Sequence, residues 1–210
     1  MSSTTASTRP GKIVCVGRNY VDHAKELGND VPKEPLIFLK PPTSVIRNGE
    51  SIVLPPESKQ VEFEGEIAVI IGKRLRRVNA EETRGAIQSV VAVNDVTARD
   101  LQRAESQWTR AKGFDTFCPI GEPAKPPADF GNLEVITRVN GQVKQRAKGS
   151  DMVFPIHDVL AYISNVMTLE PGDLVCTGTP AGVGKLSPGD EVEVEIVGVS
   201  RVKNPVSKEA

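Results

Sequence analysis

The sequence lacks most of the features that mark secreted, membrane-spanning or nucleic-acid-binding proteins. Its three cysteines, Cys15, Cys118 and Cys176, are isolated and form no Cys-x-x-Cys pair, so we expect buried, reduced thiols and a cytoplasmic location. The net charge is −1 with both signs interspersed, which indicates neither a basic groove nor a polybasic membrane patch. No apolar run approaches the length of a transmembrane helix. We therefore expect no nucleic-acid partner and no membrane partner.

The N-terminal segment also lacks the apolar core of a secretory signal. Residues 1–10 are rich in Ser and Thr and contain a single Arg, which fits a mitochondrial presequence poorly. We expect a disordered tail over residues 1–11. With 210 residues and 39% hydrophobic content, the chain is long enough for one well-formed core, so we expect a single domain over residues 12–206.

The stretch from Val61 to Gly72 is the most informative part of the sequence. Its apolar part is rich in β-branched residues and is closed by Gly72, which predicts one long strand. Glu62, Glu64 and Glu66 would share one face, with same-face neighbours about 6.5–7 Å apart. Both faces become apolar further along, so the carboxylates would be partly desolvated and would repel one another. A nearby positive charge should therefore offset the repulsion between the three carboxylates.

Two interpretations of these acids are open from the strand alone. A divalent cation such as Mg²⁺ or Mn²⁺ would take carboxylate oxygens and keep positions for water. A solvated acidic ridge at a sheet edge would need no ligand. Asp95, at the end of an expected strand over residues 89–94, is similarly ambiguous, because it could be a third oxygen ligand or the cap of a helix.

A histidine and a glutamate lie three residues apart in the segment that follows the first expected strand. Asn19 can cap a short helix and Gly28 can end it, which places His23 and Glu26 on one face. The pair could act as an acid–base dyad, because a carboxylate orients an imidazole and raises its basicity. It could equally be a chance pair on a surface helix.

Two further segments could contact an anionic ligand. Lys112 lies among Gly and aromatic residues, where it is either an ordinary loop charge or a group that neutralises an anionic intermediate. The glycines of residues 177–184 would allow close approach of the backbone, whose N–H groups could bind a carboxylate. This stretch fits neither a P-loop nor a dinucleotide-binding site. We interpret His157 as structural.

The remaining pattern alternates short strands with few helices. Asn140-Gly141 predicts a hairpin between residues 133–139 and 142–146. The capping-box pattern of Asn79 and Glu82 predicts a helix to about Gln88. Further helices are expected over residues 98–104, capped by Asp95 or Thr97, and 155–167. Further strands are expected over residues 12–16, 36–40, 52–54, 174–177, 191–197 and 199–203, the last followed by a polar tail.

Six segments, taken together and in order, resemble the fumarylacetoacetate hydrolase family. The resemblance runs from about Lys12 to Val206. Each segment alone is unspecific, but the series favours the metal interpretation of the acids. The segments are Gly17-Arg18-Asn19-Tyr20-x-x-His23-x-x-Glu26, Phe38-Leu39-Lys40-Pro41, Glu62-x-Glu64-x-Glu66-x-Ala68-Val69-x-Ile71-Gly72, Asn94-Asp95-x-Thr97-Ala98-Arg99-Asp100-x-Gln102, Lys112-x-Phe114 and Thr177-Gly178-Thr179-Pro180-x-Gly182-Val183-Gly184.

The resemblance implies a fold and a set of site residues. The family fold is α+β and mostly β, a mixed β-roll with short helices that typically forms a homodimer. Glu62 matches an acidic position outside the metal ligands. The implied roles are metal ligands for Mg²⁺ or Mn²⁺ at Glu64, Glu66 and Asp95, an acid–base dyad on a lid segment at His23 and Glu26, a lysine near the substrate at Lys112, and substrate contacts at Arg18, Gln102 and Thr179.

The activity implied by these matches is cleavage of a carbon–carbon bond in a 2-oxo acid. We expect acylpyruvate hydrolysis, oxaloacetate decarboxylation or both, through a metal-bound enolate of pyruvate, since the chain resembles the short acylpyruvase and oxaloacetate decarboxylase branch more than fumarylacetoacetate hydrolase itself. A hydratase or isomerase of an unsaturated 2-oxo acid and an oxaloacetate tautomerase are alternatives, because they pass through a similar enolate. A non-catalytic metal-binding or 2-oxo-acid-binding protein would have no need of the His23–Glu26 dyad.

Overall fold

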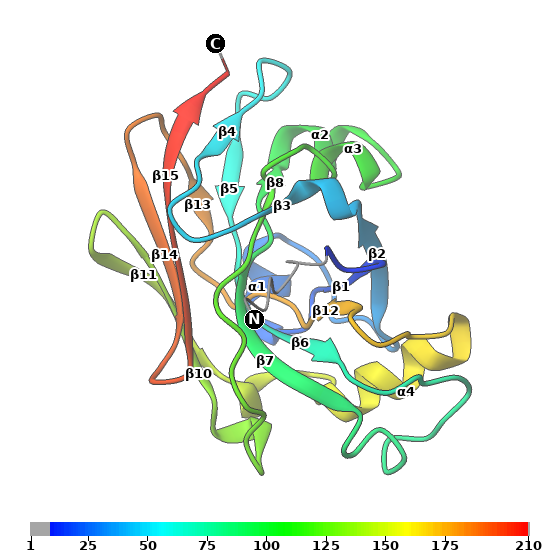
Figure 1. The fold of residues 1–210 in the computed structure, drawn as a ribbon. Coiled ribbons are helices and arrows are strands. Elements are labelled where there is room, and N and C mark those ends of the chain that lie inside the picture. The colour runs from blue at the N-terminus through cyan, green and yellow to red at the C-terminus, as the bar shows by residue number, and fades with distance from the viewer. Residues whose placement is uncertain (1–8, 210) are drawn as a thin grey trace.

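The computed structural model describes residues 9–209, which form short strands, few helices and long connections (Figure 1). Most of the tail expected over residues 1–11 lies outside the described residues. None of the helices in residues 9–209 combines the length and apolar character that a membrane crossing requires. The expected α+β, mostly β architecture is confirmed.

Two five-stranded sheets form the body of the fold. The first has the order β2-β1-β12-β6-β7 and the second the order β11-β10-β14-β15-β4. Each sheet contains one parallel pair, β1 with β12 and β15 with β4, among antiparallel pairs. The strands of the first sheet are β1 (Ile13–Gly17), β2 (Leu36–Lys40), β6 (Gly65–Ile71), β7 (Ile87–Asn94) and β12 (Leu174–Cys176). Those of the second are β4 (Ile52–Leu54), β10 (Glu134–Val139), β11 (Gln142–Lys148), β14 (Glu191–Ile196) and β15 (Ser200–Lys208).

The remaining elements are small and lie around these sheets. One minor sheet joins β13 (Gly184–Lys185), β5 (Val61–Phe63) and β8 (Thr97–Ala98), and another joins β3 (Val45–Ile46) and β9 (Cys118–Pro119). In Figure 1, α2 and α3 lie together beside β8, whereas α4 lies at the opposite end of the molecule. The helices are α1 (Val21–Glu26), α2 (Arg99–Ala104), α3 (Thr109–Lys112) and α4 (Ile156–Val166), with 3₁₀ turns at Pro42–Ser44, Phe130–Asn132 and Gly149–Asp151.

The main apolar core lies between the two large sheets and α4. It combines alternate residues of β6, such as Ile67 and Val69, with β10 and β14 residues and with the buried stripe of α4. That stripe includes Val159, Leu160 and Ile163, as the 3.6-residue period of the sequence predicts. Burial of such side chains contributes about 1.5–3 kcal/mol each. The core therefore fixes β6, the strand that carries Glu66.

The three cysteines are free and buried, as expected. Cys15 and Cys176 are register partners on the parallel strands β1 and β12. Burial raises the pKa of the Cys15 thiol to about 11, so it stays protonated at neutral pH.

The acidic stretch is two strands and not the one long strand that the sequence pattern predicts. β5 ends at Phe63 and β6 begins at Gly65, so Glu64 lies at a break. The backbone N–H groups at the break bond to side chains: Glu64 donates to Asn94 Oδ1 at 2.9 Å and Gly65 to Gln145 Oε1 at 3.0 Å. Side chains outside the acidic stretch therefore stabilise the break.

The helix expected from Asn79 to about Gln88 is absent from the described structure, where turns occupy residues 80–85. The capping box itself forms, because Asn79 N–H donates to Glu82 and Glu82 N–H donates to the Asn79 side chain. Gly85 adopts a φ of 73° and β7 begins at Ile87, which leaves less than two helical turns. A helix that short is marginal on its own.

The expected helix caps at Asn19 and at Asp95 or Thr97 are also wrong. The residues that precede α1 and α2 are Tyr20 and Ala98, and neither helix has a side-chain cap bond. The Asn19 amide instead ties the segment before α1 to the backbone of Phe154 and Thr177. The expected polar tail after residue 203 is in fact strand, because β15 continues to Lys208 and pairs with β4.

Candidate active site

The carboxylates of Glu64, Glu66 and Asp95 converge in the interior. One oxygen from each lies within 4.8 Å of the others, and the side chains come from the break before β6, from β6 and from the residue after β7. Gly65 pairs with Asn94 in the β6–β7 ladder, which brings Asp95 beside the acidic stretch. The residues are 4%, 1% and 1% exposed, so a solvated acidic ridge is excluded.

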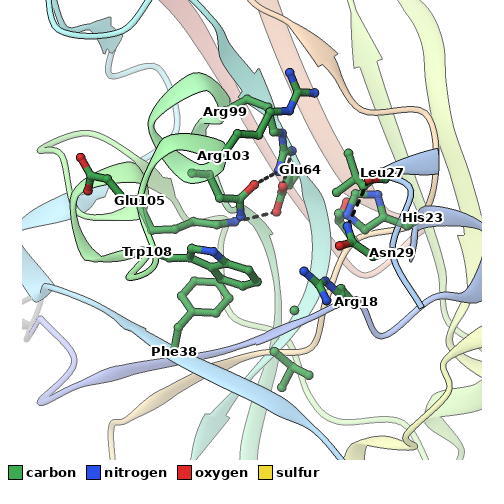
Figure 2. Close-up of a pocket in the computed structure, with 15 residues that line it drawn as sticks. Arg18, His23, Leu27, Asn29, Phe38, Glu64, Arg99, Arg103, Glu105 and Trp108 are labelled. Atoms are coloured by element: carbon green, nitrogen blue, oxygen red, sulfur yellow. Dashed lines mark hydrogen bonds and ion pairs between the residues drawn. The ribbon is translucent and has the colours of Figure 1, made fainter. Parts of the chain in front are cut away.

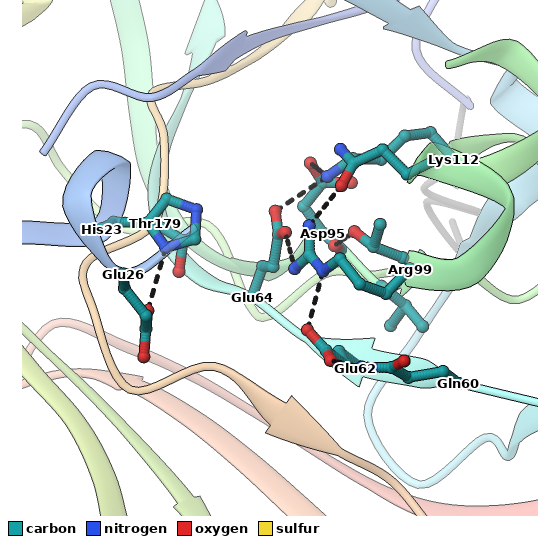
Figure 3. A network of polar contacts seen from close by, with 12 residues as sticks. His23, Glu26, Gln60, Glu62, Glu64, Asp95, Arg99, Lys112 and Thr179 are labelled. Carbon is teal, nitrogen blue, oxygen red and sulfur yellow. Dashed lines mark hydrogen bonds and ion pairs between the residues drawn. The ribbon is translucent and has the colours of Figure 1, made fainter. Parts of the chain in front are cut away.

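Three buried cations surround two of these carboxylates, and Figure 3 shows two of the three, Lys112 and Arg99. Lys112 Nζ lies 2.8 Å from Glu64 and 2.6 Å from Asp95, and Arg99 pairs with Glu64 and, at 2.7 Å, with Glu62. Lys40 Nζ lies 2.6 Å from the other oxygen of Asp95. Part of the positive charge that the acidic stretch requires is therefore supplied by the protein.

The two glutamates differ in their electrostatic surroundings. Burial acts to raise the pKa of Glu64, but Lys112 and Arg99 outweigh it and hold that pKa well below its usual value. Burial raises the pKa of Glu66 well above its usual value, and the neighbouring charges of Asp95 and Glu64 raise it further. No ion pair among residues 9–209 includes Glu66, whose Oε2 accepts a hydrogen bond from Gly178 N–H at 2.8 Å. Glu66 is thus the carboxylate that lacks a counter-charge.

The charge balance of the cluster suits a divalent cation and an anionic ligand. The cluster contains four carboxylates, namely the three convergent ones and Glu62, and the three buried cations. If every group is ionised, its net charge is −1. A divalent ion would change this to +1, and a monoanionic ligand would then neutralise the site. Carboxylate oxygens are also the donors that Mg²⁺ and Mn²⁺ prefer. The residues that would hold such an ion are Glu64, Glu66 and Asp95, and they fit it.

A cavity of about 350 Å³ opens beside Glu64 and is lined mainly by polar groups (Figure 2). The polar lining comes from the segment around α1 and from α2 and α3, while Phe38 and Trp108 form an aromatic wall. The two rings meet edge to face with centroids 5.3 Å apart. Six of the site residues expected from the sequence line this cavity: Arg18, His23, Glu64, Gln102, Lys112 and Thr179.

Arg18 extends into the cavity from the loop between β1 and α1. Its guanidinium carbon lies 5.9 Å from the centroid of the Trp108 ring, a cation–π distance. The residue adopts a φ of 58°, a left-handed conformation that is uncommon away from glycine. Such strained positions cluster at functional sites. The backbone at Arg18 therefore suits a residue placed to contact a ligand.

His23 and Glu26 form the pair that the sequence predicts. His23 Nδ1 lies 3.3 Å from Glu26 Oε2, and His23 is buried while Glu26 is partly exposed. Burial lowers the pKa of His23, which the nearby carboxylates of Glu64 and Glu26 oppose. A neutral imidazole held by a carboxylate can accept a proton near neutral pH. Because His23 is buried, the pair does not lie wholly on the surface.

The Gly-rich segment that follows β12 connects the acidic cluster to α1. Gly178 N–H contacts Glu66, as described above, and Gly182 N–H lies 3.1 and 3.2 Å from the two Glu26 oxygens. Between them, the Thr179 hydroxyl donates to Gly65 O at 2.9 Å. The carboxylate-binding backbone expected here thus serves carboxylates of the protein itself.

Three residues around the site were given no role from the sequence. Lys40 and Arg99 are buried cations, and the signal for them was the need for counter-charge beside three adjacent acids. Gln145 is buried between Gly65 and Thr179, and nothing in its hairpin strand marked it. His157, by contrast, bonds to the Thr83 hydroxyl at 2.8 Å and lines a separate cavity near α4, which agrees with its structural interpretation.

The fold and the cavity together define a protein of the mixed β-roll class whose buried acidic cluster suits a divalent metal. The chain belongs to the fumarylacetoacetate hydrolase family, because the family model described as fumarylacetoacetate (FAA) hydrolase C-terminal matches residues 12–207. The family resemblance of the six sequence segments is therefore confirmed.

Individual relatives are similar over nearly the whole chain. The uncharacterized protein MJ1656 of Methanocaldococcus jannaschii is 47% identical over 201 residues, which is 96% of this chain and 85% of that protein. The human mitochondrial oxaloacetate tautomerase FAHD2A is 44% identical over 212 residues, 95% of this chain and 67% of that protein. The crystal structure of 2-hydroxyhepta-2,4-diene-1,7-dioate isomerase from Mycobacterium marinum superposes with a TM-score of 0.88 at 44% identity, covering 96% of this chain and 76% of that one.

Proposed function

We propose that this protein is a metal-dependent isomerase or tautomerase that forms the enolate of a 2-oxo acid and reprotonates it at a different atom. The observation that carries the proposal is the convergence of three buried carboxylates, one of which, Glu64, lines a cavity that is also lined by His23. The names of two relatives, an oxaloacetate tautomerase and a diene-dioate isomerase, support this reaction class. They support it better than carbon–carbon cleavage, the activity expected first from the sequence.

His23 and Glu26 would move the proton. Nδ1–H of His23 faces Glu26, so Nε2 is the nitrogen free to take a proton from C3 of the substrate. The same imidazolium then returns the proton, to the 2-oxo oxygen in a tautomerase or to a more distant carbon in an isomerase. Glu26 holds the ring and stabilises its charged form.

The cations and polar groups of the cavity would hold the substrate and its developing charge. Mg²⁺ or Mn²⁺ bound by Glu64, Glu66 and Asp95 would supply Lewis-acid stabilisation of the enolate. Lys112 would add positive charge from the protein side. The positions of Arg18, Gln102 and Thr179 on the cavity wall suit contacts to the substrate's carboxylate and oxo groups.

Carbon–carbon cleavage is the second candidate, because the same His23–Glu26 pair would also serve it. In an acylpyruvate, the same base could take a proton from water, which would attack the distal carbonyl and release the pyruvate enolate. Oxaloacetate decarboxylation would form that enolate by loss of CO₂ without water. We retain as proposals a small 2-oxo acid substrate, a homodimer and a cytoplasmic location.

Three assays on one oxaloacetate sample test the proposal. Decay of the enol absorbance measures tautomerisation, pyruvate release measures cleavage, and deuterium incorporation at C3 in D₂O measures proton abstraction. We expect enol decay and deuterium incorporation that require Mg²⁺ or Mn²⁺, disappear with chelator and return when metal is restored. The unsaturated 2-oxo dioate substrate of an isomerase is assayed in parallel. Pyruvate release that outpaces tautomerisation would favour the cleavage candidate, and metal-independent turnover would contradict the proposed site.

A further inference from the structure

β11 turns a single residue fully inward. Along Gln142–Lys148 only Gln145 is buried, at 1% exposure. The β10–β11 register shifts after Thr137, where Thr137 pairs with Gln145 but Arg138 pairs with Val143, so Lys144 is an extra, bulged residue. Bulges re-aim side chains and are frequent beside active sites. Here the bulge directs an uncharged, fully buried amide toward the acidic stretch.

The Gln145 amide uses both its oxygen and its nitrogen in hydrogen bonds. Its Oε1 accepts from Gly65 N–H at 3.0 Å, at the break between β5 and β6. Its Nε2 donates to the Thr179 hydroxyl at 2.8 Å and to Pro180 O at 2.7 Å. Only an amide offers one acceptor and two donors in this arrangement. Glutamate would present an acceptor to Pro180 O, and methionine would leave buried groups unpaired.

The segments that Gln145 joins carry the two halves of the proposed chemistry. Gly65 lies between Glu64 and Glu66, so the Oε1 bond holds the backbone of the acidic stretch. The Thr179–Pro180 segment lies between Gly178, which donates to Glu66, and Gly182, which donates to Glu26. Gln145 therefore bonds to two backbone segments. One carries the proposed metal ligands Glu64 and Glu66, and the other donates a hydrogen bond to Glu26, which holds the proposed base.

The backbone of the bulge makes a second contact with the same segment. At Gly182, whose φ is 101°, an added Cβ would lie 2.1 Å from Lys144 O and 3.3 Å from Gln145 Cγ. The β11 chain thus touches the 177–184 segment through the Gln145 amide at one end and through Lys144 O at the other. The Gly-rich segment therefore contacts β11 at Thr179, Pro180 and Gly182.

We propose that Gln145 is a positioning residue that sets the acidic cluster and the His23–Glu26 pair at a fixed separation, by joining the β5–β6 break to the Gly-rich segment. The inference deepens the proposed function and rests on it. Gln145 touches neither the reacting atoms nor the metal ligands directly. Its effect reaches them through Gly65 on one side and through Gly178 and Gly182 on the other.

Two substitutions at Gln145 and the same two at a matched site test the proposal. Gln145→Glu replaces one amide NH₂ by oxygen, and Gln145→Met removes the polar contacts at similar volume. Gln142→Glu and Gln142→Met are the controls, because Gln142 lies on the same strand with its side chain exposed. The measurements are Mn²⁺ affinity by paramagnetic resonance, kcat and KM of the metal-loaded enzyme, and hydrogen exchange of the Gly65, Gly178 and Gly182 amides.

We expect Mn²⁺ affinity to fall about 10- to 100-fold in the Gln145 variants, as for other groups that orient metal ligands. kcat should fall more than KM rises, and the three glycine amides should exchange faster while α4 amides stay protected. The Gln142 variants should match the wild type. If Gln145→Met fails to fold, Gln145→Glu carries the test.

Three results would overturn the inference. Variants that bind Mn²⁺ and turn over like the wild type contradict it, and so does a lower Tm without faster exchange at the three glycines. Uniformly faster exchange throughout the chain would show a merely structural role. If the wild type itself binds no Mn²⁺, the proposed function fails, but glycine exchange still decides whether Gln145 holds the two segments.

Discussion

Lys40 Nζ and Asp95 Oδ1 lie 2.6 Å apart in the interior, with side chains that are 0% and 1% exposed. Lys40 also donates to Val96 O at 3.2 Å, and Lys112 holds the other oxygen of Asp95. Asp95 is therefore fixed by two ammonium groups before any metal binds. The orientation of this proposed ligand is built into the protein.

Replacing Lys40 by Met should destabilise the metal-free protein and increase its response to metal. Breaking one side of a buried ion pair costs about 3–5 kcal/mol when the remaining charge has no other partner, and Lys112 still pairs with Asp95 in this variant, so the loss should be smaller than that. A divalent ion would restore part of that charge, so added Mg²⁺ should raise the Tm of Lys40→Met by more than it raises the wild-type Tm. Thermal denaturation with and without Mg²⁺ measures both values. An equal Mg²⁺ response in the two proteins would count against the charge argument.

Glu66→Gln should stabilise the metal-free protein at alkaline pH while removing metal binding. The raised pKa of Glu66 means that the folded protein holds this proton more tightly than the unfolded chain does. The wild type therefore loses stability as pH rises from the unfolded pKa near 4.5 to the folded pKa, at about 1.4 kcal/mol for each pH unit. Glutamine does not ionise, so the variant should not lose stability in this pH range. Its side-chain oxygen can still accept the hydrogen bond from Gly178 N–H. Denaturant unfolding between pH 5 and pH 8.5 tests this.

Glu64→Gln is the matched control and should have the opposite effect on stability. Lys112 and Arg99 hold the pKa of Glu64 low, so its charge contributes stability above pH 4.5 that is lost as pH falls. The amide would leave both cations short of a partner and lower the free energy of unfolding at pH 7. Both glutamine variants should lose metal-dependent turnover. A Glu64→Gln protein with full activity would refute the ligand assignment.

The pH dependence of kcat/KM should report the protonation of His23. Burial lowers the pKa of His23, so the acid limb of kcat/KM should lie below pH 6.5 and the rate should be level above it. The same shift makes His23 contribute stability that is lost as pH falls below 6.5. His23→Ala should lower kcat about 10²- to 10⁴-fold and remove that limb. A wild-type limb that persists in His23→Ala would assign the base elsewhere.

Gly182→Ala should impair both stability and the His23–Glu26 pair. The added Cβ would lie 2.1 Å from Lys144 O at a φ of 101°, a clash and strain worth about 1–3 kcal/mol. Movement of the 177–184 segment would break the hydrogen bond that the residue 182 N–H donates to Glu26. Gly189→Ala is the control, because Gly189 has a φ of 91° but nothing within 4 Å of the added carbon. Comparable kcat values in the two variants would show that the Gly182 contact is dispensable for turnover.

Local signals in the sequence predicted much of the fold. The Asn140-Gly141 turn forms with positive φ at both residues, because that geometry depends on the two residues alone. The apolar stripe of α4 and the strand at Leu36–Lys40 are also confirmed, because each is predicted by a pattern of neighbouring residues. The family motifs brought Glu64, Glu66 and Asp95 into one group, and the structure places them together.

Features that depend on distant contacts were missed. The acidic stretch breaks at Glu64 because side chains of Asn94 and Gln145, far away in sequence, take its backbone N–H groups. The capping box at Asn79 forms without a helix, since capping cannot offset the short length before β7. Gln145 occupies a strand whose pattern is typical of an exposed one, and only the bulge directs it inward.

The order of strands in the first sheet has a consequence for folding. The hairpin-like pairs β1–β2 and β6–β7 can form early from nearby residues, but β12, only three residues long, is the strand that joins them. β12 pairs Leu174 with Ile13 on one side and with Ile70 on the other. Such distant pairings carry a large loop-closure entropy and slow folding. During synthesis, the first sheet therefore cannot be completed until residues 174–176 have left the ribosome. The acidic residues, which lie in the first half of the chain, are made well before that point.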